Sequence, residues 1–253
     1  MNEPTTRVDP HVKVLDERVV ARAKARGLDA LVYAPHFRRL PDIEARAARF
    51  SDDDLLVVPA REVFTGTWRD RKHVLAVGLD EPIPDFVTLD GAMAELRRQN
   101  VAVLVPHPEF LTVSLTDADL ARHRGDIHAV EVYNPKHFAG HNRRARDLAA
   151  EHDLPAFGSS YAHLRGTVGE VWTEFERPIE TEAELVAAFR DGAARTVVHR
   201  DGLTHRIRRR AEFAHLGWEN SGEKFERIVL GGVEATHPDH PAYDGRFDDV
   251  SVY

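Results

Sequence analysis

Short apolar runs that alternate with helical segments are the feature that most limits how this chain can fold. Ala30–Ala34 (ALVYA) and Val101–Val105 (VAVLV) are apolar throughout, which is typical of strands covered on both faces. Each run follows an amphipathic stretch with helical spacing, Asp16–Arg26 before the first and Leu89–Gln99 before the second. This alternation predicts an α/β fold, in which helices cover a parallel sheet that is closed or nearly closed.

The same alternation continues to about residue 192. Further strands are predicted at Arg7–Val14, Ile127–Asn134, Leu154–His163 and Val168–Phe175, and Val168–Phe175 is predicted to be the final strand. Further helices are predicted at Pro41–Phe50, Thr116–Arg124, Asn142–His152 and Thr181–Arg190. Within Leu55–Gly78, two apolar runs flank a short polar segment, which predicts a strand, a connection and a second strand. In such folds the chemistry lies at the C-terminal ends of the strands, so polar residues there are candidate site residues.

Length and composition narrow the class of protein. A chain of 253 residues is typical of a single α/β barrel, or of a barrel-like domain with an appendage. It has no cysteine, no long apolar run and no signal-like N-terminus, so we expect a cytoplasmic protein without a membrane span. A net charge of -8 disfavours nonspecific nucleic-acid binding as its main task. Without cysteine, any bound metal must be held by His, Asp and Glu.

Histidines and one glutamate recur at the ends of the predicted strands. The set comprises His11, His36, Glu62, His73, His107 and His163. His73 begins its strand, but a hairpin would bring it to the same end of the sheet as Glu62. Such a set suits Zn, Mn or Fe, and ions bridged by a glutamate can activate water and clamp the oxygens of a phosphate ester. The alternative is a group of unrelated histidines that cap strands by hydrogen bonds.

The order of these motifs resembles the PHP (polymerase and histidinol phosphatase) superfamily over about residues 7–192. The matching pieces are DPHVK (Asp9–Lys13), GLDALVYAPH (Gly27–His36), VVPAREV (Val57–Val63), KHVLAVG (Lys72–Gly78), VPHP (Val105–Pro108) and FGSSYAH (Phe157–His163). The later VGEVWTEF and ETEAELVAAFRDG are similar to members with a trailing PHP-associated region. The resemblance implies a distorted, TIM-like (β/α)7 barrel and metal-dependent phosphoesterase activity. It implies Glu62, His73 and His107 as the metal ligands, with His11, His36 and His163 assisting.

Departures from the family motifs fall inside the predicted site. The second histidine of the opening motif is Lys13, the aspartate of T-D-H is Pro35, and the aspartate of the last motif is Tyr161. The expected metal content is therefore one to two divalent ions rather than three. Lys13 can replace one ion electrostatically and contact a substrate phosphate, and Tyr161 can donate a hydrogen bond to it, which makes both candidate catalytic residues. Alternatively, both mark a decayed site in which Lys13 repels metal.

The chain changes character after about residue 193. We divide it into a PHP-like barrel (1–193) and a C-terminal appendage (194–253), with a helix around Ile207–Leu216 and a loosely ordered tail. The basic run Arg206–Arg210 is either a phosphate-contacting surface or a solvated helix face. His237-Pro-Asp-His240 has near metal-ligand spacing, but its prolines favour a tail loop.

The sequence therefore predicts hydrolysis of a phosphate ester, with a phosphorylated small molecule or nucleotide as substrate and nucleic acid less favoured. The competing hypothesis is a noncatalytic, partly degenerate PHP-like module. Such a module would bind a phosphorylated ligand or a nucleic-acid-processing partner through Arg206–Arg210. Salt-sensitive nucleic-acid binding, or the absence of any metal, would favour this second hypothesis.

Overall fold

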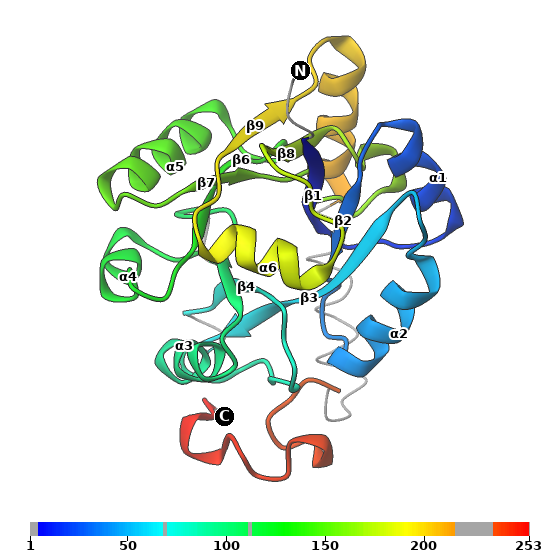
Figure 1. Ribbon diagram of the computed structural model, residues 1–253. Coiled ribbons are helices and arrows are strands. Elements are labelled where there is room, and N and C mark those ends of the chain that lie inside the picture. The colour runs from blue at the N-terminus through cyan, green and yellow to red at the C-terminus, as the bar shows by residue number, and fades with distance from the viewer. Residues whose placement is uncertain (1–4, 68–69, 111–112, 216–234, 253) are drawn as a thin grey trace.

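A mixed sheet forms the centre of the computed structural model, which describes residues 5–67, 70–110, 113–215 and 235–252 (Figure 1). In the described residues the sheet has nine strands in the order β7-β6-β5-β4-β3-β2-β1-β8-β9. They are β1 (Thr6–Val12), β2 (Ala30–Tyr33), β3 (Leu56–Thr65), β4 (Lys72–Val77), β5 (Ala102–Val105), β6 (Ala129–Tyr133), β7 (Ala156–Gly158), β8 (Val171–Phe175) and β9 (Arg195–His199). The predicted α/β class is confirmed, although β4, β8 and β9 run antiparallel to their neighbours.

The two edges of the sheet approach each other closely enough to make a nearly closed barrel. Gly158 of β7 donates its N–H to Thr173 Oγ1 of β8 at 3.0 Å, and the Thr173 hydroxyl donates back to the Gly158 carbonyl at 3.0 Å. A Cβ atom at Gly158 would lie only 2.4 Å from Val197 Cγ1 of β9. Glycine is required at position 158 because a side chain there would push the two edges apart.

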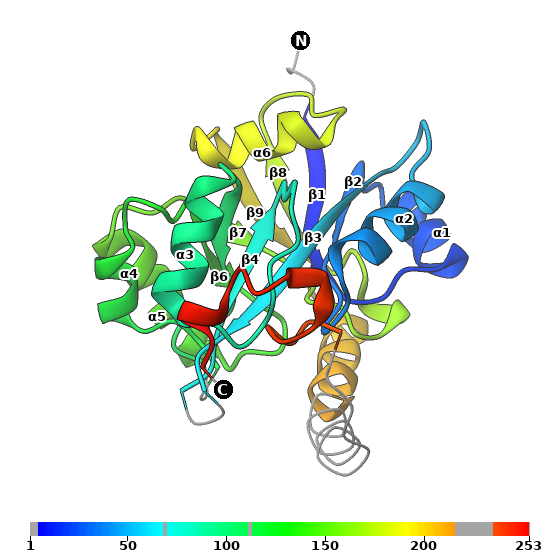
Figure 2. The same cartoon turned by 90° about the horizontal axis from the view of Figure 1, so that it is seen from below.

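Helices cover the outside of the barrel, as the sequence predicted (Figures 1 and 2). They are α1 (Glu17–Ala25), α2 (Leu40–Phe50), α3 (Leu89–Arg98), α4 (Asp117–Arg122), α5 (Ala139–Glu151) and α6 (Glu182–Arg190), with a further helix at 203–215 and 3-10 turns at Arg165–Thr167, Pro241–Tyr243 and Asp248–Val250. Local capping fixes several helix starts. Asp16 accepts the N–H groups of Arg18 and Val19 ahead of α1, and Thr181 forms a capping box with Glu184 at α6.

One end of the barrel is closed by α6, which lies across it in Figure 1. Leu185, Ala188 and Phe189 of this helix share a buried cluster with small and β-branched residues of the inward-facing strand surface, such as Val58 of β3. This apolar plug excludes water from that end. The polar side chains gather at the opposite end, where most of the parallel strands terminate.

The region after residue 193 differs from the prediction in two ways. Val168–Phe175 is not the final strand, because β9 follows and pairs antiparallel with β8 from Phe175↔Arg195 to Val171↔His199. The segment was assigned to the appendage because charged residues flank a short apolar core and mask its strand character. The helix predicted around Ile207–Leu216 is confirmed as far as residue 215 and begins earlier than predicted, at residue 203, while Leu216 lies outside the described residues. The division at residues 193 and 194 stays a prediction.

The described part of the tail, residues 235–252, is packed against the barrel rather than loosely ordered (Figure 2). Tyr243 and Phe247 are buried in the same cluster as Met93 of α3. Val252 donates its N–H to the Phe86 carbonyl at 3.0 Å. The Gly-, Pro- and Asp-rich composition suggested a loose tail, but two buried aromatic side chains supply the apolar contact that anchors it.

Candidate metal centre

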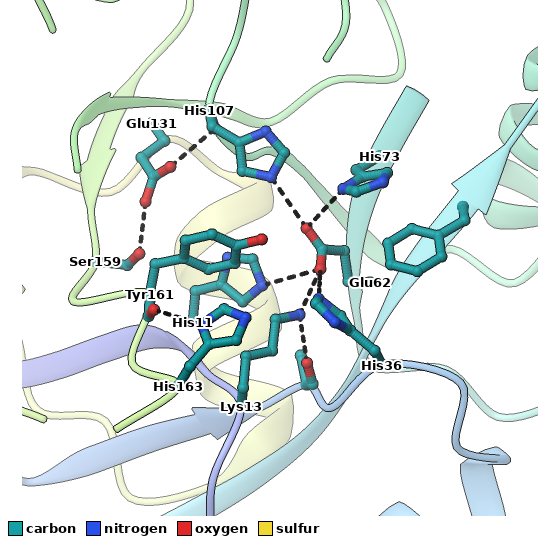
Figure 3. A network of polar contacts seen from close by, with 12 residues as sticks. His11, Lys13, His36, Glu62, His73, His107, Glu131, Ser159, Tyr161 and His163 are labelled. Carbon is teal, nitrogen blue, oxygen red and sulfur yellow. Dashed lines mark hydrogen bonds and ion pairs between the residues drawn. The ribbon is translucent and has the colours of Figure 1, made fainter. Parts of the chain in front are cut away.

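Glu62 is the residue around which the polar end of the barrel is arranged (Figure 3). The predicted hairpin is confirmed, because β3 pairs antiparallel with β4 from Ala60↔Val77 to Thr65↔Lys72. Glu62 lies within β3 rather than at its end, opposite Leu75, and is completely buried. His73 lies opposite Phe64, two residues along, which places it diagonally across the hairpin from Glu62 on the same face.

Two imidazoles face Oε1 of Glu62. His73 Nδ1 lies 3.3 Å and His107 Nε2 lies 3.1 Å from that oxygen. Ligand atoms of these three residues all lie within 4.8 Å of one another, so their predicted clustering is confirmed. Their role as ligands stays a prediction.

Hydrogen bonding around this cluster fits a bound cation. Within the described residues, neither ring nitrogen of His73 has a hydrogen-bond partner, although the ring is buried. The Ser114 hydroxyl donates to the Phe110 carbonyl and therefore accepts from His107 Nδ1, 3.1 Å away. In the neutral tautomer that donates through Nδ1, His107 Nε2 presents a lone pair to the Glu62 carboxylate, and a cation between the two acceptors would satisfy both.

The protonation states also suit a divalent ion. Burial lowers the pKa of His73 to about 4, which keeps its imidazole neutral. Burial opposes ionisation of Glu62, but the Lys13 ammonium outweighs it and holds the pKa of this carboxyl well below its usual value. Neutral imidazoles beside an ionised carboxylate are the forms that bind metal.

Oε2 of Glu62 faces a different set of groups, with Lys13 at its centre. Lys13 Nζ lies 2.5 Å from Oε2 and 2.6 Å from the Ala34 carbonyl oxygen. His36 Nε2 lies 2.8 Å and His11 Nε2 lies 3.7 Å from the same oxygen. Burial, and then the Lys13 charge, lower the pKa of His36 to about 3. The ammonium thus lies among groups that the sequence predicted as metal ligands.

His163 meets a second buried ammonium, which the sequence did not predict. Lys136 Nζ lies 2.5 Å from His163 Nδ1, 3.2 Å from Glu212 Oε2 and 4.0 Å from the ring centroid of Tyr161. Glu212 comes from the helix at 203–215 and also accepts the N–H groups of His163 and Leu164 at 3.1 and 2.8 Å. The helix at 203–215 therefore contributes a buried carboxylate to this end of the barrel.

Tyr161, a predicted catalytic residue, lies between the two ammonium groups and the histidines. Its ring centroid lies 4.6 Å from that of His11 and 5.3 Å from that of His107. Its φ of 45° is in the left-handed region, which costs a bulky residue about 1–3 kcal/mol. The surrounding contacts therefore hold this ring in place against a local conformational cost.

Glu131 is a buried carboxylate that accepts hydrogen bonds from residues next to the site. Its Oε2 accepts the backbone N–H of His107 at 2.8 Å and the Asn134 amide at 3.0 Å, and its Oε1 accepts the Ser159 hydroxyl at 2.5 Å. His107 itself has a positive φ of 35°. The part of Glu131 is therefore to fix the backbone that carries His107.

Comparisons with known proteins agree with this architecture. A family model described as PHP-associated matches residues 139–194, and no curated protein matches the chain. The fold is similar to that of PsfC from Pseudomonas syringae PB-5123, with 20% identity and a TM-score of 0.62 over 85% of this chain and 100% of that one. It is also similar to the lesion-specific endonuclease PfuEndoQ from Pyrococcus furiosus, with 17% identity and a TM-score of 0.54 over 77% of this chain and 58% of that one.

The predicted resemblance to the PHP superfamily is confirmed over residues 139–194 by the PHP-associated family model. An amidohydrolase from Chromobacterium violaceum, solved with sulfate and no metal, has a similar fold at 14% identity, with a TM-score of 0.53 over 76% of this chain and 97% of that one. At such identities the likeness concerns the PHP-like fold alone. Among the described residues of this chain, no helix combines the length and apolar character needed to cross a membrane.

A pocket of about 780 Å³ opens beside the PHP-like centre. Lys13 and His163 line it at the site end, and Arg38, Arg46 and Arg165 line its wall together with two aspartates. Arg165 pairs with one of these, Asp16, at 2.5 Å. The pocket gives Lys13 a route to solvent along a wall that carries several guanidinium groups.

Two residues of the polar end of the barrel, Lys136 and Glu212, were not predicted from the sequence. Lys136 lies in the segment after β6 (Ala129–Tyr133), and a lysine is uncommon in this arginine-rich chain, so its position was a usable signal. Glu212 offered no such signal, because it lies on a helix beside the basic run Arg206–Arg210. Only the packing of that helix against the barrel brings its carboxylate to Lys136.

Proposed function

We propose that this PHP-like chain hydrolyses phosphate esters with one divalent ion held by Glu62, His73 and His107. The observation that carries the proposal is the division of Glu62 between two environments. Its Oε1 faces two imidazoles, whereas its Oε2 is paired with the Lys13 ammonium. In this proposal the ammonium takes the place of a second cation, so one ion suffices.

Each part of the centre has a defined task in this reaction. The bound ion would supply Lewis acidity and lower the pKa of a coordinated water. Lys13 lines the pocket and carries a fixed positive charge, which would attract a phosphoryl oxygen and stabilise the charge that develops there. The Tyr161 hydroxyl would donate a hydrogen bond to the same group. Pocket-wall arginines favour an anionic substrate.

The noncatalytic alternative remains a prediction. It relies on the basic run Arg206–Arg210 as a contact surface for a partner. Two of these arginines already contact the protein itself, since Arg208 pairs with Glu170 and Arg209 donates to the His137 carbonyl. Such internal use supports the hydrolase proposal over a basic docking surface.

Metal content per chain tests the proposal directly. Protein purified without chelator, and protein reconstituted with Zn, Mn or Fe, is analysed by mass spectrometry beside Glu62→Ala and a control, His152→Ala. His152 follows α5 and pairs with Asp117, away from the centre. We expect one equivalent of metal in the wild type and control and none in Glu62→Ala, with hydrolysis of phosphate monoesters and diesters following the metal.

Two results would contradict the proposal in different ways. Absence of metal after reconstitution would leave a PHP-like binding module without a metal centre. Metal bound through Glu62 without hydrolysis of any phosphate ester would keep the site and remove the activity.

A further inference from the structure

A second concentration of charge lies away from Glu62, around the buried carboxylate of Glu170. Three guanidinium groups contact Glu170 Oε1, from Arg22 at 3.0 Å, Arg26 at 3.2 Å and Arg208 at 2.5 Å. His205 Nδ1 lies 3.0 Å from Oε2. These groups come from α1 with its C-cap and from the helix at 203–215. One carboxylate cannot neutralise three guanidinium groups, so positive charge remains.

Arg200, just after β9, adds a fourth guanidinium. It donates to the carbonyls of Gly169 at 3.2 Å and Arg26 at 3.4 Å, and it lies 5.5 Å from the ring centroid of Trp172. Within the described part of the chain it has no carboxylate partner. The other acidic group at this place, Asp201, is 86% exposed and lies 3.4 Å from His199. The cluster therefore holds four guanidinium groups and two carboxylates, and three of the guanidinium groups, those of Arg26, Arg200 and Arg208, line a common pocket with both carboxylates.

The excess charge faces a pocket of about 520 Å³. Arg26, Arg200 and Arg208 line it together with the two acidic residues Glu170 and Asp201, and the other lining residues are Trp172, His199, Thr204 and His205. Burial and the neighbouring arginines Arg26 and Arg208 lower the pKa of Arg22 to about 10, and burial and Arg200 lower the pKa of Arg26. Desolvation and mutual repulsion thus outweigh the attraction of Glu170, and an anion in the pocket would offset the repulsion.

We propose that this pocket binds a phosphate group, either free or carried by a small organic phosphate. A phosphate group matches the excess of positive charge in the cluster, and the planar, fixed donors of arginine suit its oxygens. Each guanidinium has five N–H donors, of which the contacts above use one or two. None of these residues takes part in the Glu62 centre, so the inference is independent of the proposed hydrolase function.

Calorimetric titration tests this site on the full chain. Inorganic phosphate is titrated at low salt into metal-free protein carrying Lys13→Met with Glu62→Gln, which removes the ammonium proposed to contact phosphate at the other site and leaves no unpaired charge there. Adding Arg200→Gln to this protein is expected to weaken phosphate binding at least tenfold, because one charge-assisted hydrogen bond is lost. This arginine is chosen because its removal leaves no buried carboxylate without a partner. Arg206→Gln is the matched control, because Arg206 is exposed, lies in the same region of the chain and does not line the pocket. This variant should leave the phosphate affinity unchanged.

Glu170→Gln provides a test with the opposite sign. It removes the internal anion that competes with phosphate, so affinity should rise, while thermal melting verifies that the variant is folded. Should it not fold, the comparison of Arg200→Gln with Arg206→Gln still decides. A nucleoside monophosphate that binds more tightly than phosphate would assign an organic ligand, and equal affinities would assign the free ion. Absence of phosphate binding, or equal weakening by Arg200→Gln and Arg206→Gln, would overturn the proposal and leave a structural ion-pair network.

Discussion

Replacing Lys13 by methionine would remove the ammonium from Glu62 while keeping most of the side chain. The two charged atoms are 2.5 Å apart, and the side chains are 5% and 0% exposed. At an effective dielectric constant of about 20, their attraction at this distance is about 7 kcal/mol. Desolvation offsets part of that value, and breaking a buried pair by removing one partner costs about 3–5 kcal/mol. We expect the free energy of unfolding of the metal-free variant to fall by that amount.

Urea denaturation followed by circular dichroism measures the loss. Lys13→Met with Glu62→Gln removes both charges and should be less destabilised than the sum of the two single variants, because no uncompensated charge remains. Lys24→Met is the control, since Lys24 pairs with Asp52 and Asp54 at the surface. Such exposed pairs contribute little to stability, so this variant should unfold close to the wild-type urea midpoint.

Added metal extends the same experiment. If the Lys13 ammonium takes the place of a cation, Lys13→Met should bind one additional Zn or Mn ion. The metal should then stabilise the variant more than the wild type, by about 2.7 kcal/mol when the free metal concentration is a hundred times the dissociation constant of the additional ion. The metal content should rise accordingly. In the variant Lys13→His with Tyr161→Asp, a gain of metal with loss of activity supports replacement of an ion, whereas a gain of both supports a decayed site.

The reasoning is refuted by either of two results. A loss of less than about 1 kcal/mol in metal-free Lys13→Met would mean that Glu62 is not a buried charge balanced by this ammonium. A larger loss that Glu62→Gln does not reduce would assign the effect to packing rather than to charge.

Three further variants test other parts of the structure. Glu212→Gln should lower the free energy of unfolding by about 3–5 kcal/mol, because Lys136 stays buried without its carboxylate, and it should also lower phosphoesterase activity. An unchanged melting temperature would contradict the coupling of the helix at 203–215 to the site. Phe247→Ala should cost about 3–5 kcal/mol in urea denaturation, and a neutral effect would mean that the tail is not packed in the core. Gly158→Ala should cost about 1–3 kcal/mol through its clash with Val197, with recovery when Val197→Ala makes room, and failure to recover would contradict the barrel closure described here.

Much of the architecture was determined by the sequence itself. Apolar runs such as Val101–Val105 and caps such as Asp16 and Thr181 specify strands and helix starts through neighbours in the chain. The hairpin that joins Glu62 to His73 was predictable for the same reason, because turn position and alternation are local properties. From these elements, the convergence of the strand-end histidines follows once the sheet is nearly closed.

Only the tertiary structure decided how charge is balanced inside the site. Lys13 could be predicted near Glu62, but its direct pairing with one carboxylate oxygen depends on the depth at which both groups are buried. Lys136 meets Glu212 only because the helix at 203–215 packs against the barrel, and no local pattern encodes that contact. Burial sets the energy of each charge, and burial is a property of the assembled fold rather than of any segment.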